Sequence, residues 1–242
     1  GARLVDCYRE LEQPAARANV LRAALLREQG GVYLDTDTLT LGSFTNLRAR
    51  GGFFCGEERL VFPKTRGPWW VSRLDPRALG RTLARDVCRR LPHGYRHFRR
   101  IERLYRTAVN NAVLGAEARH PLVDELIARM QSLPKAERSV RYSLGVHLLQ
   151  RVVAEWSGAD VHVEPPETFY PLGPEISEHW FRDQGVSDPN EVITARTLLV
   201  HLYASVRIQQ KLERVNVAWV RSHRHSELFS ALAAPLLDEL GW

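Results

Sequence analysis

The sequence predicts a single compact α/β domain over residues 1–242, for reasons of length, composition and local pattern. With 242 residues and 44% apolar side chains, the chain can bury a sizeable core without disulfide or metal crosslinks. Near its start, a helical pattern ends at a glycine pair and gives way to a short apolar run. No apolar run reaches the roughly 18 residues of a membrane span.

The first predicted element is a helix over Pro14–Gln29. Proline is favoured in a first helical turn, and Gly30 provides the residue type that ends helices. Asn19 and Arg22 are three residues apart and therefore lie side by side on this helix, looking toward the carboxylates that follow. The buried arc is expected to comprise Val20, Leu21, Ala24 and Leu25.

Two aspartates follow the glycine pair, in Gly30-Gly31-Val32-Tyr33-Leu34-Asp35-Thr36-Asp37. In a strand, alternate side chains share a face, so Asp35 and Asp37 would point at the same object. Two neighbouring carboxylates repel each other, whereas a Mg²⁺ or Mn²⁺ ion would make the pair favourable and leave positions open for phosphate oxygens. The pattern predicts a metal–diphosphate clamp, with the Arg22 guanidinium beside it.

These residues resemble a known family. The segment from Asn19 to Asp37 is similar to the sugar-nucleotide site of glycosyltransferase family 32, which is named for its Asp-x-Asp sugar-binding region. That family includes α-1,4-galactosyltransferases, and clostridial glucosylating toxins share its site. Three later blocks follow in the family's order, namely Val109–Ala116 with His120-Pro121, Pro165–Pro171 as a strand near the acceptor side, and Val200–Tyr203 with Ser205.

The resemblance implies a GT-A-like, Rossmann-like mixed sheet flanked by helices. It also implies a metal-dependent hexosyltransferase that works with retention at the anomeric carbon. The cofactor would be Mn²⁺ or Mg²⁺, and the donor a nucleotide-sugar, with UDP favoured over GDP. The acceptor would be a hydroxyl of a glycan, glycolipid or protein.

Site residues carried over from the family fall into three roles. The catalytic set is Asp35, Asp37 and Arg22. The donor-binding set is Asn19, Arg22, Tyr33, Asp35, Asn110 and Asn111, with either asparagine as the contact to the transferred sugar. The metal set is Asp37, Asp35 and His201, since a neutral imidazole suits Mn²⁺ better than Mg²⁺.

Four departures from the family pattern bear on these expectations. Asn19 stands where the family usually has Asp, which affects the choice of sugar. Tyr203 replaces the usual Trp, and Gly145 is followed by Val146 rather than Pro. Only a few residues precede the first helix, so the family's N-terminal strand, which forms the nucleotide-base pocket, has no counterpart here. Two explanations stay open: the chain is a fragment, or another part of it holds the base.

Two alternative functions stay open. Asp35-Thr36-Asp37-Thr38 also fits the first motif of haloacid-dehalogenase-type phosphatases, in which the first Asp is a nucleophile and the second a general acid. Such enzymes also need a lysine that is followed closely by an acidic pair. No such pair follows Lys64, Lys135 or Lys211. The other alternative is a non-catalytic relative that binds sugar nucleotides, motivated by Asn19 and the short N-terminus.

The segment 64–106 is strongly basic and is expected to be an insertion. It carries Lys64 and twelve arginines against three acidic residues, while the whole chain has a net charge of +6. An amphipathic helix is predicted by the apolar residues at four-residue spacing, Leu79, Leu83, Val87 and Leu91. With Trp69-Trp70 ahead of it, this segment is predicted to contact an anionic membrane surface or glycan, or else to be a solvated face.

Nucleic acid is not expected as a partner, because no helix-turn-helix, zinc-finger or RNP-like signature occurs. The three cysteines, Cys7, Cys55 and Cys88, are scattered and lack a Cys-x-x-Cys spacing. Buried thiols in a reducing compartment are therefore expected. We expect a cytoplasmic protein, and a membrane contact by the basic segment would be with the inner face of the membrane.

Overall fold

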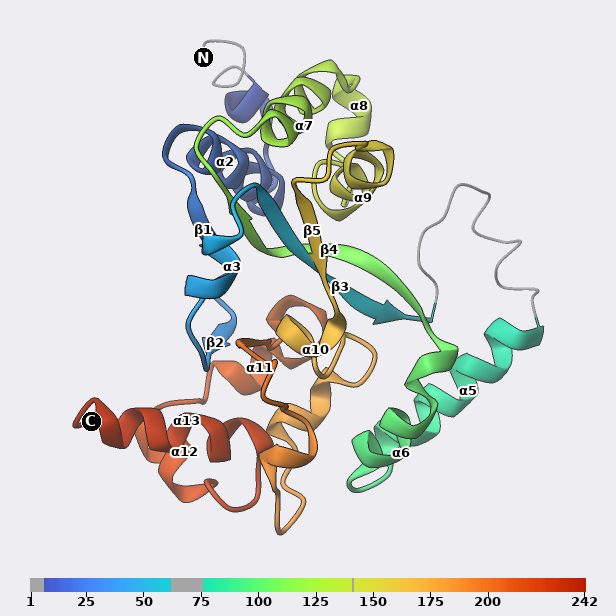
Figure 1. Ribbon diagram of the computed structural model, residues 1–242. Helices are drawn as coiled ribbons and strands as arrows, with labels where there is room; N and C mark the ends of the chain where they lie inside the picture. The colour runs from blue at the N-terminus through green and yellow to red at the C-terminus, as the bar shows by residue number, and fades with distance from the viewer. Residues whose placement is uncertain (1–6, 62–75, 141) are drawn as a thin grey trace. The chain divides into compact units, whose positions relative to one another are not determined.

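The computed structural model describes residues 7–61, 76–140 and 142–242, apart from the side chain of Arg207 (Figure 1). It forms two compact units, each made of several chain segments. The first unit contains the described residues of Gly1–Asp35, Ser43–Glu57 and Val109–Pro165. The second contains the described residues of Thr36–Gly42, Glu58–Ala108 and Pro166–Trp242.

The first unit is built on a four-stranded sheet of order β1-β4-β3-β5. Its strands are β1 (Gly31–Leu34), β3 (Phe53–Leu60), β4 (Arg106–Ala116) and β5 (Val161–Glu164). Residues 58–60 of β3 and 106–108 of β4 belong to the second unit. β1 pairs antiparallel with β4, with Gly31 opposite Ala116. β3 pairs parallel with β5, with Phe53 opposite Val161. Both strand orientations occur, so the expected mixed sheet is confirmed.

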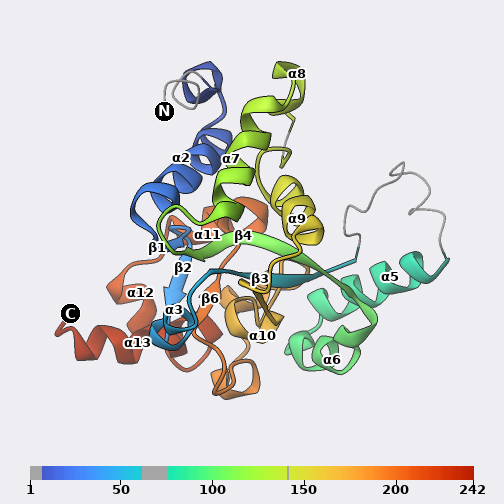
Figure 2. The same cartoon turned by 45° about the horizontal axis from the view of Figure 1, so that its top comes forward.

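Helices cover this sheet and bury its apolar side chains (Figure 2). They are α2 (Pro14–Gln29), α7 (Pro121–Ser132) and α9 (Val146–Glu155), with the shorter α3 (Thr45–Ala49) and α8 (Lys135–Arg138) in the same unit. Strand residues such as Phe53 and Leu114 share one core with Val20 of α2, Leu122 of α7 and Leu148 of α9. The expected α/β class, with helices flanking a mixed sheet, is therefore correct.

Helix α2 has the predicted bounds, because Pro14 occupies its first turn and Gly30 ends it with a φ of 64°. Of the predicted buried arc, Val20 is buried and Ala24 is half-buried, whereas Leu21 and Leu25 are 49% and 43% exposed. The residues that α2 buries are Ala16, Val20, Arg22, Ala23 and Leu26. Small alanines at the contact face let the helix backbone approach the sheet, which leaves the two leucines outward.

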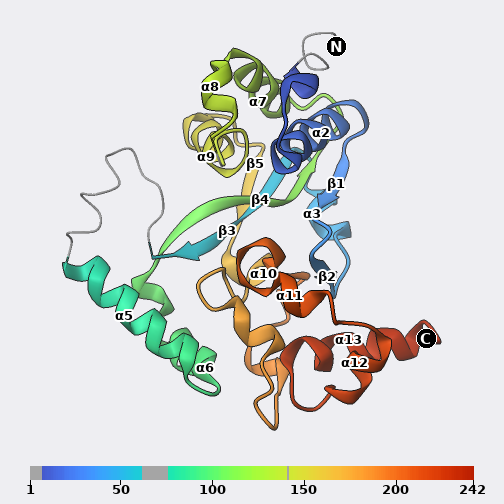
Figure 3. The same cartoon turned by 180° about the vertical axis from the view of Figure 1, so that it is seen from behind.

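The second unit contains a two-stranded antiparallel sheet of β2 (Thr38–Thr40) and β6 (Leu199–His201). In it, Thr38 lies opposite His201. Helical segments make up most of the rest (Figure 3). They are α5 (Pro76–Arg90), α6 (Gly94–Ile101), η1 (Glu102–Leu104), α10 (Pro166–Phe169), η2 (Ser177–Phe181), η3 (Pro189–Glu191), η4 (Ala204–Ile208), α11 (Gln209–Leu212), α12 (Val217–Ser222) and α13 (Leu228–Glu239).

The core of the second unit is separate from that of the first. It gathers Tyr95 and Phe98 of α6 with Trp180 of η2, Val200 of β6 and Leu228 of α13. One expectation is corrected in this region, because Pro166–Phe169 forms helix α10 rather than a strand. The prolines explain the change, since proline cannot donate to a sheet ladder but fits a first helical turn.

Helix α5 confirms the predicted amphipathic helix in the basic segment. Leu79, Leu83 and Val87 lie on it, and it packs against α6 (Figure 3). Trp69 and Trp70 lie outside the described residues. No helix in the described ranges combines the length and apolarity needed to cross a bilayer. The three cysteines are buried and unpaired, as expected.

The expected single domain over residues 1–242 stays a prediction. The division into two compact units reflects which parts of the chain contact one another in the folded structure. Whether the units fold as one cooperative domain is a separate thermodynamic property.

Candidate active site

Arg22 is the centre of a polar cluster in the first unit. It is only 6% exposed, and its Nη2 lies 3.0 Å from Oδ1 of Asp35. Nη1 donates to the carbonyl oxygen of Asn111, and Cζ lies 4.5 Å from the centre of the Tyr33 ring. The Tyr33 hydroxyl donates to the same Asp35 oxygen at 2.9 Å. A buried guanidinium requires such matched partners, so these contacts account for the arginine on the inner side of α2.

Two amides extend the cluster. Nδ2 of Asn111 on β4 donates to Oδ1 of Asn19 on α2 at 2.8 Å. The backbone of Gly145 passes close to this pair, because a Cβ built on Gly145 would lie 2.9 Å from Nδ2 of Asn19 and 3.1 Å from Nδ2 of Asn111. A side chain at position 145 would push the two amides apart. We call Asn19, Arg22, Tyr33, Asp35 and Asn111 the Arg22 cluster.

Asp35 follows strand β1 rather than lying in it. The strand ends at Leu34, although the Asp35 N–H still donates to the carbonyl of Ala112 at 2.8 Å. Residues 36 and 37 form a turn before β2 begins at Thr38. The alternation of strand side chains therefore does not apply to Asp35 and Asp37, which corrects the reason first given for their common direction. The motif sits where the chain leaves the first unit and enters the second.

In the second unit, Asp37 pairs with His201. Nε2 of His201 on β6 lies 3.2 Å from Oδ1 of Asp37, and the backbone N–H of Ala204 donates to Oδ2 at 2.8 Å. Antiparallel pairing of β2 with β6 brings these residues together, and the N–H of Leu202 donates to the Asp37 carbonyl at 2.9 Å. We call this the Asp37–His201 pair.

Electrostatics favour a charged carboxylate at Asp37. Burial alone would raise the pKa of Asp37, but the hydrogen bond and charge interaction with His201, together with the Ala204 N–H, lower the pKa below its ordinary value. His201 is itself buried. Within the described part of the chain, its Nδ1 is buried and has no hydrogen-bond partner. A carboxylate and an imidazole form a donor set that suits a divalent cation, and Nε2 of His201 is the ring nitrogen that faces Asp37.

Aromatic residues surround this pair. The rings of His201 and Tyr203 have centroids 4.1 Å apart, and those of His201 and Tyr170 are 5.8 Å apart. The Tyr203 hydroxyl donates to Oε2 of Glu58 at 2.7 Å. Burial, with the negative charge of Glu58 beside it, raises the pKa of Tyr203 well above its ordinary value. Tyr203 is therefore a neutral hydrogen-bond donor whose ring packs against that of His201.

The structure thus brings the predicted site residues into two groups. Asn19, Arg22, Tyr33, Asp35 and Asn111 belong to the Arg22 cluster, and Asp37 and His201 form the pair. Asn110 is different, because its Oδ1 accepts from the N–H of Ala112 at 2.7 Å and the residue is buried. Of the two asparagines that the sequence left as alternatives, Asn111 is the one in the cluster.

Sequence reasoning missed three contributors to these groups. Ala204 acts through its backbone N–H, which leaves no signal in its residue type. Nothing in the sequence distinguishes Glu58 from other strand residues, although its carboxylate accepts a hydrogen bond from the Tyr203 hydroxyl. Gly145 was noted only as a departure from the family pattern, yet the lack of a side chain there leaves room for the amide pair.

A comparison with protein families supports a glycosyltransferase-like role for this α/β protein. Residues 3–54 match the family described as glycosyltransferase sugar-binding region containing DXD motif, which confirms the family resemblance over about a fifth of the chain. The matched segment contains both aspartates, Asn19, Arg22 and Tyr33, and ends before Asn111 and His201. A comparison with curated proteins gave no match.

Proposed function

We propose that this protein is a metal-dependent retaining glycosyltransferase that moves a hexose from a nucleotide-sugar, with UDP favoured, to a hydroxyl of a glycan, glycolipid or protein. The observation that carries the proposal is the fixed geometry of Asp35. This carboxylate lies in the family-matched segment and is held by Arg22 at 3.0 Å and by the Tyr33 hydroxyl at 2.9 Å. Catalysis by preorganised polar groups needs such fixed side chains.

We further propose that Asp37 and His201 hold Mn²⁺ or Mg²⁺, together with Asp35, which stands two residues before Asp37 in the chain. The lowered pKa of Asp37 keeps it anionic at neutral pH. Each carboxylate oxygen has two lone pairs, so Asp37 can keep its bond to the Ala204 N–H while it binds a cation. When bound, the cation would neutralise the charge that develops on the departing diphosphate.

The remaining residues of the Arg22 cluster would bind and orient the donor. Asp35 accepts hydrogen bonds from ribose and sugar hydroxyls, and the amides of Asn111 and Asn19 bind the transferred sugar. Arg22 keeps its proposed place beside the donor and in the catalytic set. Its contacts with Asp35 and the carbonyl of Asn111 also hold the Asp35 carboxylate in a fixed direction. Retention at the anomeric carbon rests on the family resemblance alone.

One observation favours a second candidate, a sugar-nucleotide-binding protein without transferase activity. Asn19 replaces the family's usual aspartate, and its amide oxygen is engaged by Asn111 at 2.8 Å. An amide cannot supply the negative charge of a carboxylate at that point. Such a protein would bind donor and not turn it over.

A turnover assay separates these functions. Purified protein is incubated with UDP- and GDP-hexoses in Mn²⁺, and nucleotide release is measured with and without an acceptor panel. We expect metal-dependent release that Asp37→Ala abolishes and that the exposed matched control Asp238→Ala leaves unchanged, with both variants folded by circular dichroism. Metal-dependent turnover that survives Asp37→Ala contradicts the proposal.

Two other results would redirect the assignment. Donor binding without release, against every acceptor, favours the binding protein. Release of inorganic phosphate from phosphomonoesters, without sugar-nucleotide turnover, favours the phosphatase. The structure argues against the phosphatase, because the nucleophile of such phosphatases follows a central parallel strand, whereas β1 is an antiparallel edge strand.

We also propose that the protein is cytoplasmic.

A further inference from the structure

Helix α5 presents a row of aliphatic side chains to solvent. Leu79, Leu83 and Val87 are 56%, 58% and 56% exposed, and Leu91, just after the helix, is also exposed. Four-residue spacing places them along one side of the helix. Isolated exposed leucines are ordinary, but a continuous row of four indicates a surface that something covers. We call these four residues the α5 stripe.

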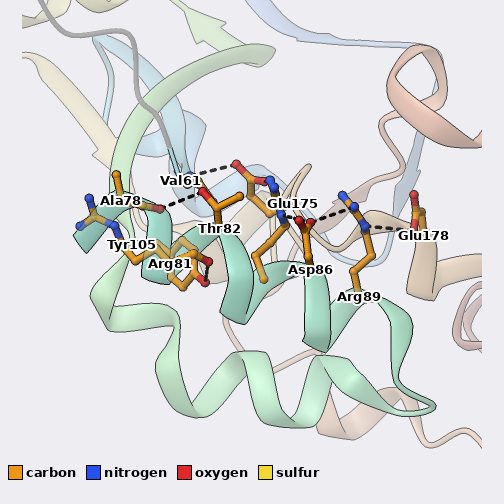
Figure 4. Close-up of polar contacts among 10 residues, drawn as sticks. Val61, Ala78, Arg81, Thr82, Asp86, Arg89, Tyr105, Glu175 and Glu178 are labelled. Carbon is orange, nitrogen blue, oxygen red and sulfur yellow. Dashed lines mark hydrogen bonds and ion pairs between the residues drawn. The ribbon is translucent and has the colours of Figure 1, made fainter. Parts of the chain in front are cut away.

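The opposite side of α5 carries the polar contacts (Figure 4). Arg85 pairs with Glu175, and the second Glu175 oxygen accepts from the N–H of Val61 at 2.9 Å. Arg89 lies 2.9 Å from Asp86 and 3.7 Å from Glu178. Arg85 and Arg89 are therefore turned toward the protein, whereas Arg77 and Arg90 of the same helix are exposed.

This arrangement fixes the rotation of the helix. Glu175 is buried, and Ala78 and Cys88 of α5 are buried beside the polar contacts. Rotating α5 to hide the α5 stripe would separate Arg85 from Glu175 and leave a buried carboxylate without its cation. The Tyr105 hydroxyl adds a further restraint, because it donates to the carbonyl of Arg81 at 2.7 Å (Figure 4). The α5 stripe faces solvent because the opposite side of the helix makes these buried polar contacts.

The segment that carries the α5 stripe is positively charged. Residues 76–106 contain ten arginines and two acidic residues, Asp86 and Glu102. Both acids have arginine partners, Arg85 and Arg89 for Asp86 and Arg59 for Glu102. Helical geometry places the exposed Arg90 among the stripe residues. An anionic surface is therefore the electrostatic complement of this side of the helix.

We propose that α5 docks on the surface of an anionic lipid bilayer, with the α5 stripe in the acyl boundary and the exposed arginines among lipid phosphates. A helix of 15 residues is too short to span a bilayer, whereas an amphipathic helix with an aliphatic row and flanking arginines can lie in the interface. A protein partner is disfavoured, because the exposed row consists of leucine and valine, which are under-represented among the hot-spot residues of protein interfaces.

A vesicle-binding assay on the whole protein tests the proposal. Binding is measured to vesicles of phosphatidylcholine alone and to vesicles that also contain phosphatidylserine. We expect binding to the second kind only, weakened by salt. Leu83→Asp/Val87→Asp should lower the partition coefficient by about tenfold or more, since it places two charges in the apolar boundary. Arg90→Glu should also weaken binding.

The matched control is Leu21→Asp/Leu25→Asp, which makes the same change at two exposed leucines four residues apart on α2. It should bind as the wild type does. Equal binding by Leu83→Asp/Val87→Asp and wild type overturns the proposal, as does the absence of vesicle binding by a folded wild type. Two further results also overturn it: a dimer of the wild type that the α5 variant dissociates, and binding to heparin in place of vesicles. The first identifies a second copy as the occupant, and the second a soluble polyanion.

Discussion

Arg22 holds several protein groups with one guanidinium, which makes lysine a poor replacement. A lysine ammonium is a point charge on a flexible stem and cannot pair with Asp35, donate to Asn111 and stack on Tyr33 at once. We expect Arg22→Lys to lower the free energy of unfolding by about 2 kcal/mol and to weaken donor binding by about tenfold. Chemical denaturation and calorimetry measure the two effects.

Arg27→Lys is the control for that change. Arg27 lies on the same helix, but it is more exposed and its partners, Asp124 and Glu28, are surface carboxylates. Surface pairs contribute little, so the control should change the unfolding free energy by less than about 1 kcal/mol. Equal effects of the two substitutions would show that Arg22 has no special place in the cluster.

The residue scale also shows where sequence reasoning works. Residue type and family resemblance point to Asp35, Asp37 and His201, and each of these side chains is held by partners that orient it. The burial of Arg22 was not predicted, because pattern analysis treats arginine as a solvent residue. Only its partners, which come from β1, β4 and the chain after β1, make burial favourable.

At the scale of elements, α5 and η2 are joined by a buried histidine. His179 is fully buried, and its Nε2–H donates to the carbonyl of Cys88 at 3.1 Å. Burial lowers the pKa of His179 from 6.5 to about 4. The folded protein therefore holds this imidazole neutral where an unfolded chain would protonate it.

This shift predicts a pH dependence of stability. Between the unfolded pKa of 6.5 and the folded pKa of about 4, the unfolded state binds more protons, so stability is lost as the pH falls through that window. The loss amounts to about 3 kcal/mol. Chemical denaturation across this pH range should show a smaller loss for His179→Gln than for wild type. His97→Gln, at an exposed position, should retain the wild-type slope; a wild-type slope in His179→Gln would refute the account.

The elements were predicted unevenly, for physical reasons. Helix α2 has strong end signals in Pro14 and Gly30, and its bounds follow from them. Pro165–Pro171 has no such signal for a strand, and its prolines start helix α10 instead. For α5, periodicity gives the helix but not which side faces the protein. That orientation depends on Glu175, which is distant in the sequence.

At the scale of the whole molecule, the α/β class and the mixed sheet could be predicted, whereas the division into two compact units could not. Composition and helix–strand alternation specify a class. Each unit instead gathers segments far apart in the chain, and β2 meets β6 only through long-range pairing. The Asp-x-Asp motif lies where the chain passes between units, so its two aspartates belong to separately built polar groups.

The central proposal is that the protein binds a sugar nucleotide through a divalent metal ion. Calorimetric titration of the wild-type protein with UDP- and GDP-hexoses, with Mn²⁺ and then with a chelator, tests it most directly. The account predicts saturable binding of at least one nucleotide-sugar that requires Mn²⁺ and is lost on chelation. Binding of equal affinity without metal, or no binding of any nucleotide-sugar by the folded protein, would contradict it.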